Sequence, residues 1–182
     1  MIKRNTGLIA KLYINHIAVA IYGLLMAIIG NYIGNKSMDG NPVLSYVFGA
    51  IAVIMYIGII YVNFWELGAS DKIKIDGGRL SYNMYTGLIV SLVATAPSIL
   101  FGLLGFLSRF ISGEFFEFSR IICHYYNGMY ISFLGPLSGF APIYLIILLP
   151  ALVTGFVSYI LGAKGYKCLF PEPKKKQQER IE

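Results

Sequence analysis

The sequence predicts an all-α transmembrane protein, folded as a helical bundle of four spans. Only 13% of its residues are charged and 57% are hydrophobic, whereas a soluble domain usually carries about 25% charged residues. The charges are also unevenly placed, since no Asp, Glu, Lys or Arg occurs from Gly40 to Trp65 or from Leu80 to Ser108. A helix needs about 20 mostly apolar residues to cross a bilayer. We therefore expect the lipid bilayer to cover much of the surface.

The first two spans are expected over residues 8–34 and 43–66. The first carries only Lys11 as a charged residue before its far end, and the lysine side chain can reach back to the headgroups. Its apolar run is too long for a signal peptide and no small-residue cleavage site follows, so we interpret it as a retained span. The second ends in Phe64 and Trp65, an aromatic pair typical of a membrane interface.

The third and fourth spans are expected over residues 86–108 and 142–163, each with a proline near its middle. We expect Pro97 to kink the third span, because proline cannot donate the helix hydrogen bond to the carbonyl one turn earlier. Interrupted helices often line binding sites in membrane proteins. Pro97 and Pro150 are therefore candidate markers of such a site.

The segment between these two spans allows three interpretations. Residues 121–163 carry no Asp, Glu, Lys or Arg, and 43 residues make enough helix for two crossings. The sequence GPLSGFAP at residues 135–142 interrupts that run. Residues 114–134 therefore form a full span, a re-entrant hairpin or an interfacial helix. Glu117, Arg120 and His124 recur at helical spacing opposite aromatic residues, which favours an interfacial helix.

The basic residues predict the orientation. The N-terminus, the three connections and the tail hold 3, 1, 3, 2 and 6 Lys and Arg residues in chain order. Cytoplasmic segments are enriched in Lys and Arg, so these counts fit four spans with both termini in the cytoplasm. We expect residues 1–169 to form a domain in the plasma (cytoplasmic) membrane and residues 170–182 to form a basic, mobile cytoplasmic tail.

The loop at residues 66–87 joins the second and third spans on the cytoplasmic side. Its sequence KIKIDGGRLSY, residues 72–82, alternates polar and apolar residues around Asp76, Gly77 and Gly78. This composition is favoured in tight turns, so we expect a short β-hairpin. Asp71 and Asp76 match neither phosphate-binding fingerprint, and we interpret them as loop residues rather than as a site.

Asn15, His16 and Glu66 are the candidate functional residues at the spans, since ionisable or polar groups in a membrane often mark sites. For Asn15 and His16, a hydrogen bond to a neighbouring helix is favoured over a polar cavity or a metal site. Glu66 ends a span where the headgroup layer is wet, so anchoring is favoured over a transport role.

Glu117, Arg120 and His124, with Cys123 beside them, come nearest to a catalytic cluster. Adjacent helical residues point about 100° apart, so His124 is badly placed to activate the Cys123 sulfur. A solvated face or a recognition surface is favoured. In this topology His16 and His124 lie on opposite sides of the membrane and cannot share a metal, and Cys123 and Cys168 also lie on opposite sides.

No catalytic, cofactor or metal motif is present, so we expect neither an enzyme nor a cofactor. Cytoplasmic flanks explain the net charge of +6, so we expect no nucleic-acid partner. The favoured function is a subunit or accessory of a larger membrane complex; the alternative is a small transporter or substrate-binding component near the interrupted helices. Small residues also share helix faces, which let helices approach closely. Such faces suit packing within the chain, in a homo-oligomer or against a membrane protein partner. The three sets are Gly23, Ala27 and Gly30; Ser91, Thr95, Ser98, Gly102 and Gly105; and Gly155, Ser158 and Gly162.

Overall fold

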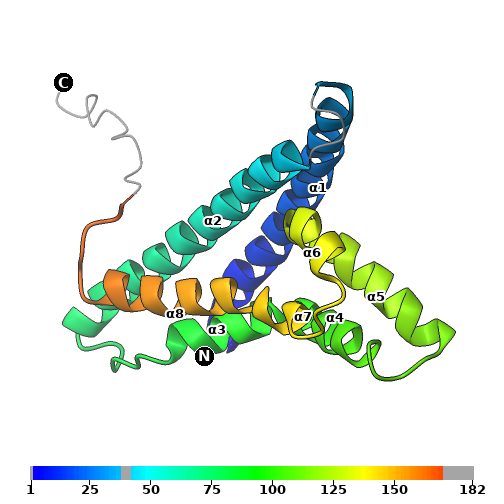
Figure 1. Ribbon diagram of the computed structural model, residues 1–182. Helices are drawn as coiled ribbons and strands as arrows, with labels where there is room; N and C mark the ends of the chain where they lie inside the picture. The colour runs from blue at the N-terminus through cyan, green and yellow to red at the C-terminus, as the bar shows by residue number, and fades with distance from the viewer. Residues whose placement is uncertain (1, 38–41, 170–182) are drawn as a thin grey trace.

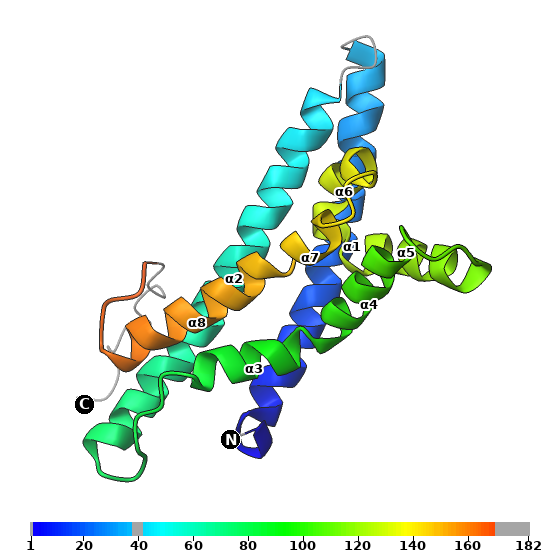
Figure 2. The same ribbon diagram turned by 60° about the horizontal axis from the view of Figure 1, so that its bottom comes forward.

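The computed structural model describes residues 2–37 and 42–169, and within these ranges it contains helices and no strand. A short 3₁₀ helix, η1 (Ile2–Asn5), leads into α1 (Thr6–Ser37), and α2 (Val43–Asp76) returns beside it. At 32 and 34 residues each helix is about 50 Å long. The two lie close together where α1 ends and α2 begins, and they diverge towards their other ends (Figures 1 and 2).

The third predicted span consists of two helices, α3 (Thr86–Ala94) and α4 (Ala96–Leu107), bent by 63°. Pro97 lies in the first turn of α4 and has no N–H for the Val93 carbonyl. That carbonyl oxygen instead accepts a hydrogen bond of 2.6 Å from the Tyr13 hydroxyl of α1. Thr95, at the break, donates its hydroxyl to the Ser91 carbonyl oxygen at 2.8 Å. The kink expected at Pro97 is confirmed.

The chain then forms α5 (Glu114–Tyr126), the 3₁₀ helix η2 (Gly128–Tyr130) and α6 (Ile131–Leu137). The helices α5 and α6 have 13 and 7 residues, so each is shorter than the roughly 20 residues of a full crossing. η2 packs closely against α1, since a Cβ on Gly23 would lie 2.7 Å from the Met129 nitrogen. α6 reaches the start of α2, where the Ser45 hydroxyl donates to the Ser132 hydroxyl at 3.2 Å.

The last helices are α7 (Ile143–Ile146) and α8 (Leu149–Ala163), and Pro150 lies in the first turn of α8. α8 packs against α2 and α3 in both views (Figures 1 and 2). Its contacts depend on glycines. A Cβ on Gly162 would lie 2.9 Å from the Ala69 nitrogen of α2, which is closer than a Cβ atom can approach without a shift of the backbone. On the α3 side, a Cβ on Gly155 would lie 2.9 Å from the Ser91 hydroxyl. Small residues let helix backbones approach this closely.

The small-residue faces noted in the sequence pack largely within this chain. In α1, Gly23 contacts η2 and Gly30 contacts Ser45 of α2. In α4, both glycines contact Tyr144 of α7. Of the three uses that the sequence leaves open for these faces, packing within the chain is the one observed at these glycines.

Among the described residues, three helical segments are long and apolar enough to cross a membrane: Thr6–Lys36, Val43–Asp76 and Ile143–Ala163, the last made of α7 and α8. The α3–α4 pair passes the same test only when it is counted as one broken span. Large aliphatic side chains cover the outside of α1 and α2, and Ile14 and Ile54 are 68% and 69% exposed. These features suit a multi-pass membrane protein.

The β-hairpin expected at residues 72–82 is wrong. α2 continues as a helix to Asp76, and only the residues after it turn. Extending an existing helix adds one hydrogen bond for each residue fixed, whereas an isolated hairpin is only marginally stable. Lys72 and Asp76 suit the helix, because their ion pair of 2.7 Å spans one turn. Gly78, at φ 69°, then lets the chain leave α2. The expected tail, residues 170–182, lies outside the described residues.

Candidate functional site

His16 is the centre of a buried polar junction between four helices. Its side chain projects from α1 and is 5% exposed. Its Nδ1 lies 2.9 Å from the Tyr56 hydroxyl of α2, and its Nε2 lies 3.0 Å from the Tyr126 carbonyl oxygen at the end of α5. The Ser98 hydroxyl of α4 is 3.4 Å from Nε2. The junction therefore joins α1 and α2 to the broken span and to α5.

The hydrogen bonds of His16 define its tautomer. A carbonyl oxygen can only accept, so Nε2 carries the proton that is donated to Tyr126. In the neutral ring Nδ1 is then an acceptor, and the Tyr56 hydroxyl donates to it. The rings of His16 and Tyr126 also stack, with centroids 4.7 Å apart. In this arrangement both nitrogens of His16 have partners.

A small cavity and a large open groove lie beside this junction. The cavity has a volume of about 20 Å³, roughly the size of one water molecule, and its lining includes Asn15, His16 and Thr95. The groove has a volume of about 550 Å³ and lies between α1 and α2. Asn15 and Ile59 line both spaces. The full lining of the groove is Asn15, Ile54, Met55, Gly58, Ile59, Val62 and Asn63.

Asn63 is a buried amide on the α2 side of the groove, and its residue is 4% exposed. Its Nδ2 donates to the Ile59 carbonyl oxygen, one turn earlier, at 2.7 Å. Its Oδ1 is also buried and has no hydrogen-bond partner among the described residues. A buried polar atom without a partner is costly, most of all in a membrane. Asn63 therefore holds one buried, unsatisfied acceptor next to the groove.

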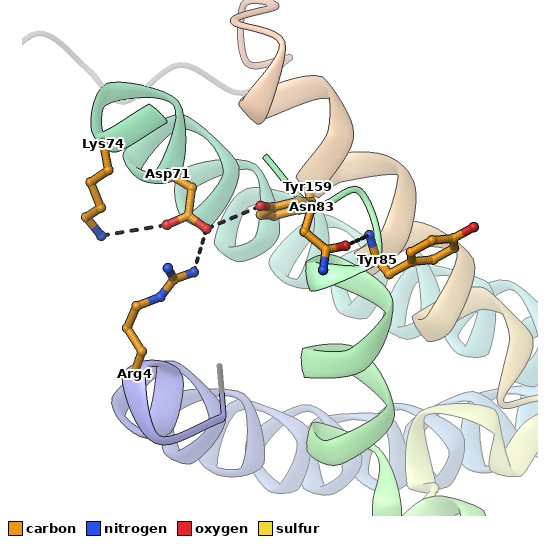
Figure 3. A network of polar contacts seen from close by, with 6 residues as sticks. All are labelled: Arg4, Asp71, Lys74, Asn83, Tyr85 and Tyr159. Atoms are coloured by element: carbon orange, nitrogen blue, oxygen red, sulfur yellow. Dashed lines mark hydrogen bonds and ion pairs between the residues drawn. The ribbon is translucent and has the colours of Figure 1, made fainter. Parts of the chain in front are cut away.

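A second polar network ties together three distant segments at the end of α2 (Figure 3). Its centre is Asp71, whose side chain is fully buried. Asp71 Oδ2 accepts hydrogen bonds from Arg4 Nη2 at 2.8 Å and from the Tyr159 hydroxyl of α8 at 3.2 Å. Lys74 Nζ lies 3.7 Å from the other carboxylate oxygen. Nearby, the Asn83 side chain accepts from the backbone N–H of Tyr85 at the start of α3 (Figure 3).

The polar residues of α5 form contacts on its own face and with α7. Arg120 pairs with Glu117, one turn earlier. His124 Nε2 lies 3.1 Å from the Tyr144 hydroxyl of α7. Burial lowers the pKa of His124, and the positive charge of Arg120 lowers this pKa further. The polar stripe therefore consists of an ion pair whose Glu117 is exposed and one contact, from His124, to α7.

Cys123 does not fit the role of a nucleophile. Its side chain is fully buried, and burial raises the pKa of its thiol to about 11. The thiolate is the reactive form of cysteine, so at neutral pH Cys123 is an inert buried thiol. Its polar contact is with Asn127, whose Nδ2 lies 3.7 Å from the sulfur.

The structure brings some of the candidate residues together and separates others. Asn15 and His16 line the same cavity, together with Thr95 at the break between α3 and α4, two residues before Pro97. Glu66 is exposed on α2 and lines neither the cavity nor the groove. Pro150 starts α8 and does not line these spaces either.

His16 and His124, which the sequence places on opposite sides of the membrane, have different partners in the structure. His124 itself contacts Tyr144, but α5 reaches His16 two residues later, through the Tyr126 carbonyl. The reason is the close approach of η2 to α1, where Gly128 packs against the Ala20 backbone. No feature of one helix considered alone reveals this contact.

Sequence reasoning also missed Asp71, Arg4, Tyr56 and Asn63. The sequence places Asp71 in a loop, although Phe64, Gly68 and Asp71 follow helical spacing and are all buried on α2. That periodicity was the available signal. Arg4 gave no such signal, because its partner lies 67 positions away in the chain.

Within the described ranges, no group of three or more His, Cys, Asp or Glu side chains is placed to hold a metal ion. No protein-family model matches the chain, and neither a curated protein nor a solved structure matches it.

Proposed function

We propose that the chain is a four-span protein of the plasma membrane with both termini in the cytoplasm. In this topology α1 and α2 are complete spans, α7 and α8 together form another, α3 and α4 form one broken span, and α5 to α6 lie at the outer interface. The exposed aromatic face of α5, with Phe115, Phe118 and Tyr125 60–63% exposed, suits a helix at the lipid headgroups.

Contacts at one end of the bundle support this topology. Arg4 and Tyr159 both bond to Asp71, so the N-terminal segment, the end of α2 and the end of α8 lie together. Trp65 adds a hydrogen bond of 3.0 Å from its indole N–H to the Tyr166 carbonyl oxygen after α8. Basic residues also gather at this end, as the positive-inside rule expects of a cytoplasmic side: Arg4, Lys72, Lys74, Lys164 and Lys167.

Within this topology the proposed function is that of a non-enzymatic, substrate-binding membrane component. The observation that carries it is Asn15, a polar side chain that lines both a large open groove and the small cavity beside His16. Interrupted helices bring polar groups to that junction, as they do in membrane proteins that bind solutes within the bilayer. A small transporter is one form of such a component.

The experiment is a thermal-shift survey of the full chain in nanodiscs against a library of membrane-soluble and polar metabolites. At least one compound is expected to raise the unfolding temperature of the wild type saturably. Asn15→Ala is expected to weaken this effect by about tenfold or more, the loss of one well-placed hydrogen bond. Asn35→Ala is the matched control, because Asn35 is exposed near the far end of the same helix. A library without a stabilising compound, or equal effects of both variants, would overturn the proposal.

A subunit or accessory role in a larger membrane complex is the second candidate. The small-residue faces of the protein pack against other helices of the same chain. The exposed aromatic face of α5 is the surface that a membrane protein partner would cover. Crosslinking in native membranes tests this role. A chain that purifies alone in mild detergent and forms no crosslinked product would argue against it.

A further inference from the structure

The segment that follows α8, residues 164–169, begins with a glycine turn, and we call it the α8 turn. Gly165 has φ 81°, a left-handed conformation that glycine adopts without strain. Its backbone N–H donates to the Gly162 carbonyl oxygen at 2.9 Å, and the N–H of Tyr166 donates to the Leu161 carbonyl oxygen at 3.0 Å. Backbone groups therefore cap these two carbonyls of α8, and no lysine side chain is needed for that purpose.

Two hydrogen bonds hold the α8 turn against α2. The indole N–H of Trp65 donates to the Tyr166 carbonyl oxygen at 3.0 Å, and the backbone N–H of Leu169 donates to the Tyr61 hydroxyl oxygen at 3.2 Å. Tyr61 lies one turn before Trp65 on α2, so the α8 turn runs back along α2 from the end of α8. The ends of α2 and α8 lie on the same side of the molecule in both views (Figures 1 and 2). Trp and Tyr side chains are typical of the lipid headgroup level.

The α8 turn exposes apolar and basic side chains together. Tyr166 and Leu169 are 60% and 74% exposed. Lys164 and Lys167 are exposed as well, and neither has an acidic partner among the described residues. An aromatic and an aliphatic side chain suit the acyl region of a membrane, whereas lysines reach back to the headgroups. The α8 turn therefore has the composition of a lipid-contacting surface.

Lys72 of α2 lies beside the α8 turn but adds no free charge to it. A Cβ on Gly165 would lie 3.2 Å from Lys72 Cδ, so the lysine stem packs against the turn. Lys72 Nζ pairs with Asp76 at 2.7 Å, one helical turn further along α2. Within the described residues, the uncompensated positive charges of this surface are therefore those of Lys164 and Lys167.

These two charges favour an anionic headgroup over a zwitterionic one. A lysine ammonium binds phosphate as a compact point charge. The choline cation of phosphatidylcholine would meet the same lysines as a like charge, whereas an anionic lipid carries no such cation. A basic residue at an anionic membrane surface contributes about 1 kcal/mol, which is about fivefold in affinity.

We propose that the α8 turn is a binding site for an anionic glycerophospholipid. The phosphate lies beside Lys164 and Lys167, and the acyl chains lie beside Tyr166 and Leu169. In the proposed topology this lipid belongs to the cytoplasmic leaflet. The site is separate from the groove at Asn15 and does not depend on the binding of a substrate there.

The test uses Trp65, which is the one tryptophan of the sequence and bonds directly to the α8 turn. The full chain is placed in phosphatidylcholine bilayers that contain increasing fractions of a lipid brominated near its glycerol end. Bromine quenches tryptophan fluorescence on contact, so the quenching curve gives the relative occupancy of the lipid beside Trp65. Brominated phosphatidylglycerol is expected to bind at least fivefold more strongly than brominated phosphatidylcholine with the same acyl chains.

A charge-matched pair of double variants localises the preference. Lys164→Gln with Lys167→Gln is expected to bring the two lipids to within twofold of equal binding. Lys11→Gln with Lys36→Gln removes the same charge from exposed positions of α1 outside the turn and is expected to keep the preference. The preference of the wild type is also expected to fall at about 1 M salt, where the Debye length is about 3 Å.

Equal binding of the two lipids by the wild type would overturn the inference, and this comparison holds even if a variant fails to fold. A preference that salt does not change would also overturn it. The same is true if the preference survives Lys164→Gln with Lys167→Gln, or if the α1 variants lose it to the same extent. The unfolding midpoint of each variant shows whether its fold is intact. The proposed function is tested separately, because it concerns compounds whose effect depends on Asn15.

Discussion

Asp71 is the one buried charged residue among the side chains that the structure describes. A carboxylate can be buried only if other groups satisfy it, and here Arg4 and Tyr159 do so from the two ends of the chain. His16 follows the same rule, since both of its ring nitrogens have partners on other helices. Single polar side chains thus connect segments that are distant in the sequence.

Asp71→Asn is expected to destabilise the protein by about 1–3 kcal/mol, because the charge-assisted bond from Arg4 is lost. The measurement is the thermal unfolding midpoint in detergent or nanodiscs. Lys74→Gln is the control, since Lys74 Nζ is 3.7 Å from the carboxylate and its side chain is 42% exposed. An exposed pair contributes about 0–1 kcal/mol. Equal losses in the two variants would contradict the assigned role of Arg4.

His124 is expected to make stability depend on pH. Burial and Arg120 lower its pKa in the folded protein, whereas the unfolded value is about 6.5. The unfolded chain then binds more protons as the pH falls through 6.5, so the folded state loses stability below that pH and keeps it above.

The measurement compares the unfolding midpoints of the wild type and His124→Gln between pH 7.5 and 5.5. Glutamine can still bond to the Tyr144 hydroxyl but does not titrate, so the wild type should lose more stability on acidification. Identical pH profiles would show that His124 does not contribute.

At the scale of the element, the sequence predicts most of the helices because their signals are local. Uncharged runs define α1 and α2, and Pro97 locates the break between α3 and α4. The hairpin at residues 72–82 could not be excluded in this way. Its alternating composition is compatible with a strand, and the helical spacing of Phe64, Gly68 and Asp71 is too short a pattern to outweigh it.

The α2–α8 interface depends on glycines that permit close backbone contact. Gly162→Ala is expected to destabilise the protein by about 1–3 kcal/mol, because its Cβ would press on the backbone at Trp65 and Ala69. Gly58→Ala, in open space on α2, is expected to be neutral or stabilising by up to about 1 kcal/mol, through the higher helix propensity of alanine. Thermal unfolding of both variants checks the difference. If the Gly162→Ala protein is as stable as the Gly58→Ala protein, α2 and α8 can move apart without a loss of stability.

At the scale of the whole molecule, the sequence predicts the class of protein but not how the segments meet. Asn15 and His16 were candidates because polar residues stand out in an apolar span. Tyr56, Ser98 and Asn63 did not stand out, since their roles depend on how the helices are rotated against each other. The partners of His16 come from positions 40, 82 and 110 residues away.

The proposed topology puts the α4–α5 loop outside and the end of α8 inside the cell. Cys123 cannot report on this difference, because it is fully buried. Ser112→Cys in a Cys123→Ala background places a thiol in the exposed loop before α5. With a membrane-impermeant maleimide, this thiol is expected to react in intact cells, whereas Cys168 is expected to react only after permeabilisation. Reaction of Cys168 from outside would contradict four spans with a cytoplasmic C-terminus.

The Asp71 network also has a consequence for the biogenesis of the protein. Its contacts join residues 67 and 88 positions apart, so Asp71 Oδ2 gains both of its hydrogen bonds only after the N-terminal segment and α8 have been synthesised and brought together. A chain that lacks α8, or whose N-terminal segment is misplaced, leaves this acid without one of its two hydrogen-bond donors. The same network that stabilises the mature fold thus distinguishes complete chains from incomplete ones, which a quality-control protease could recognise.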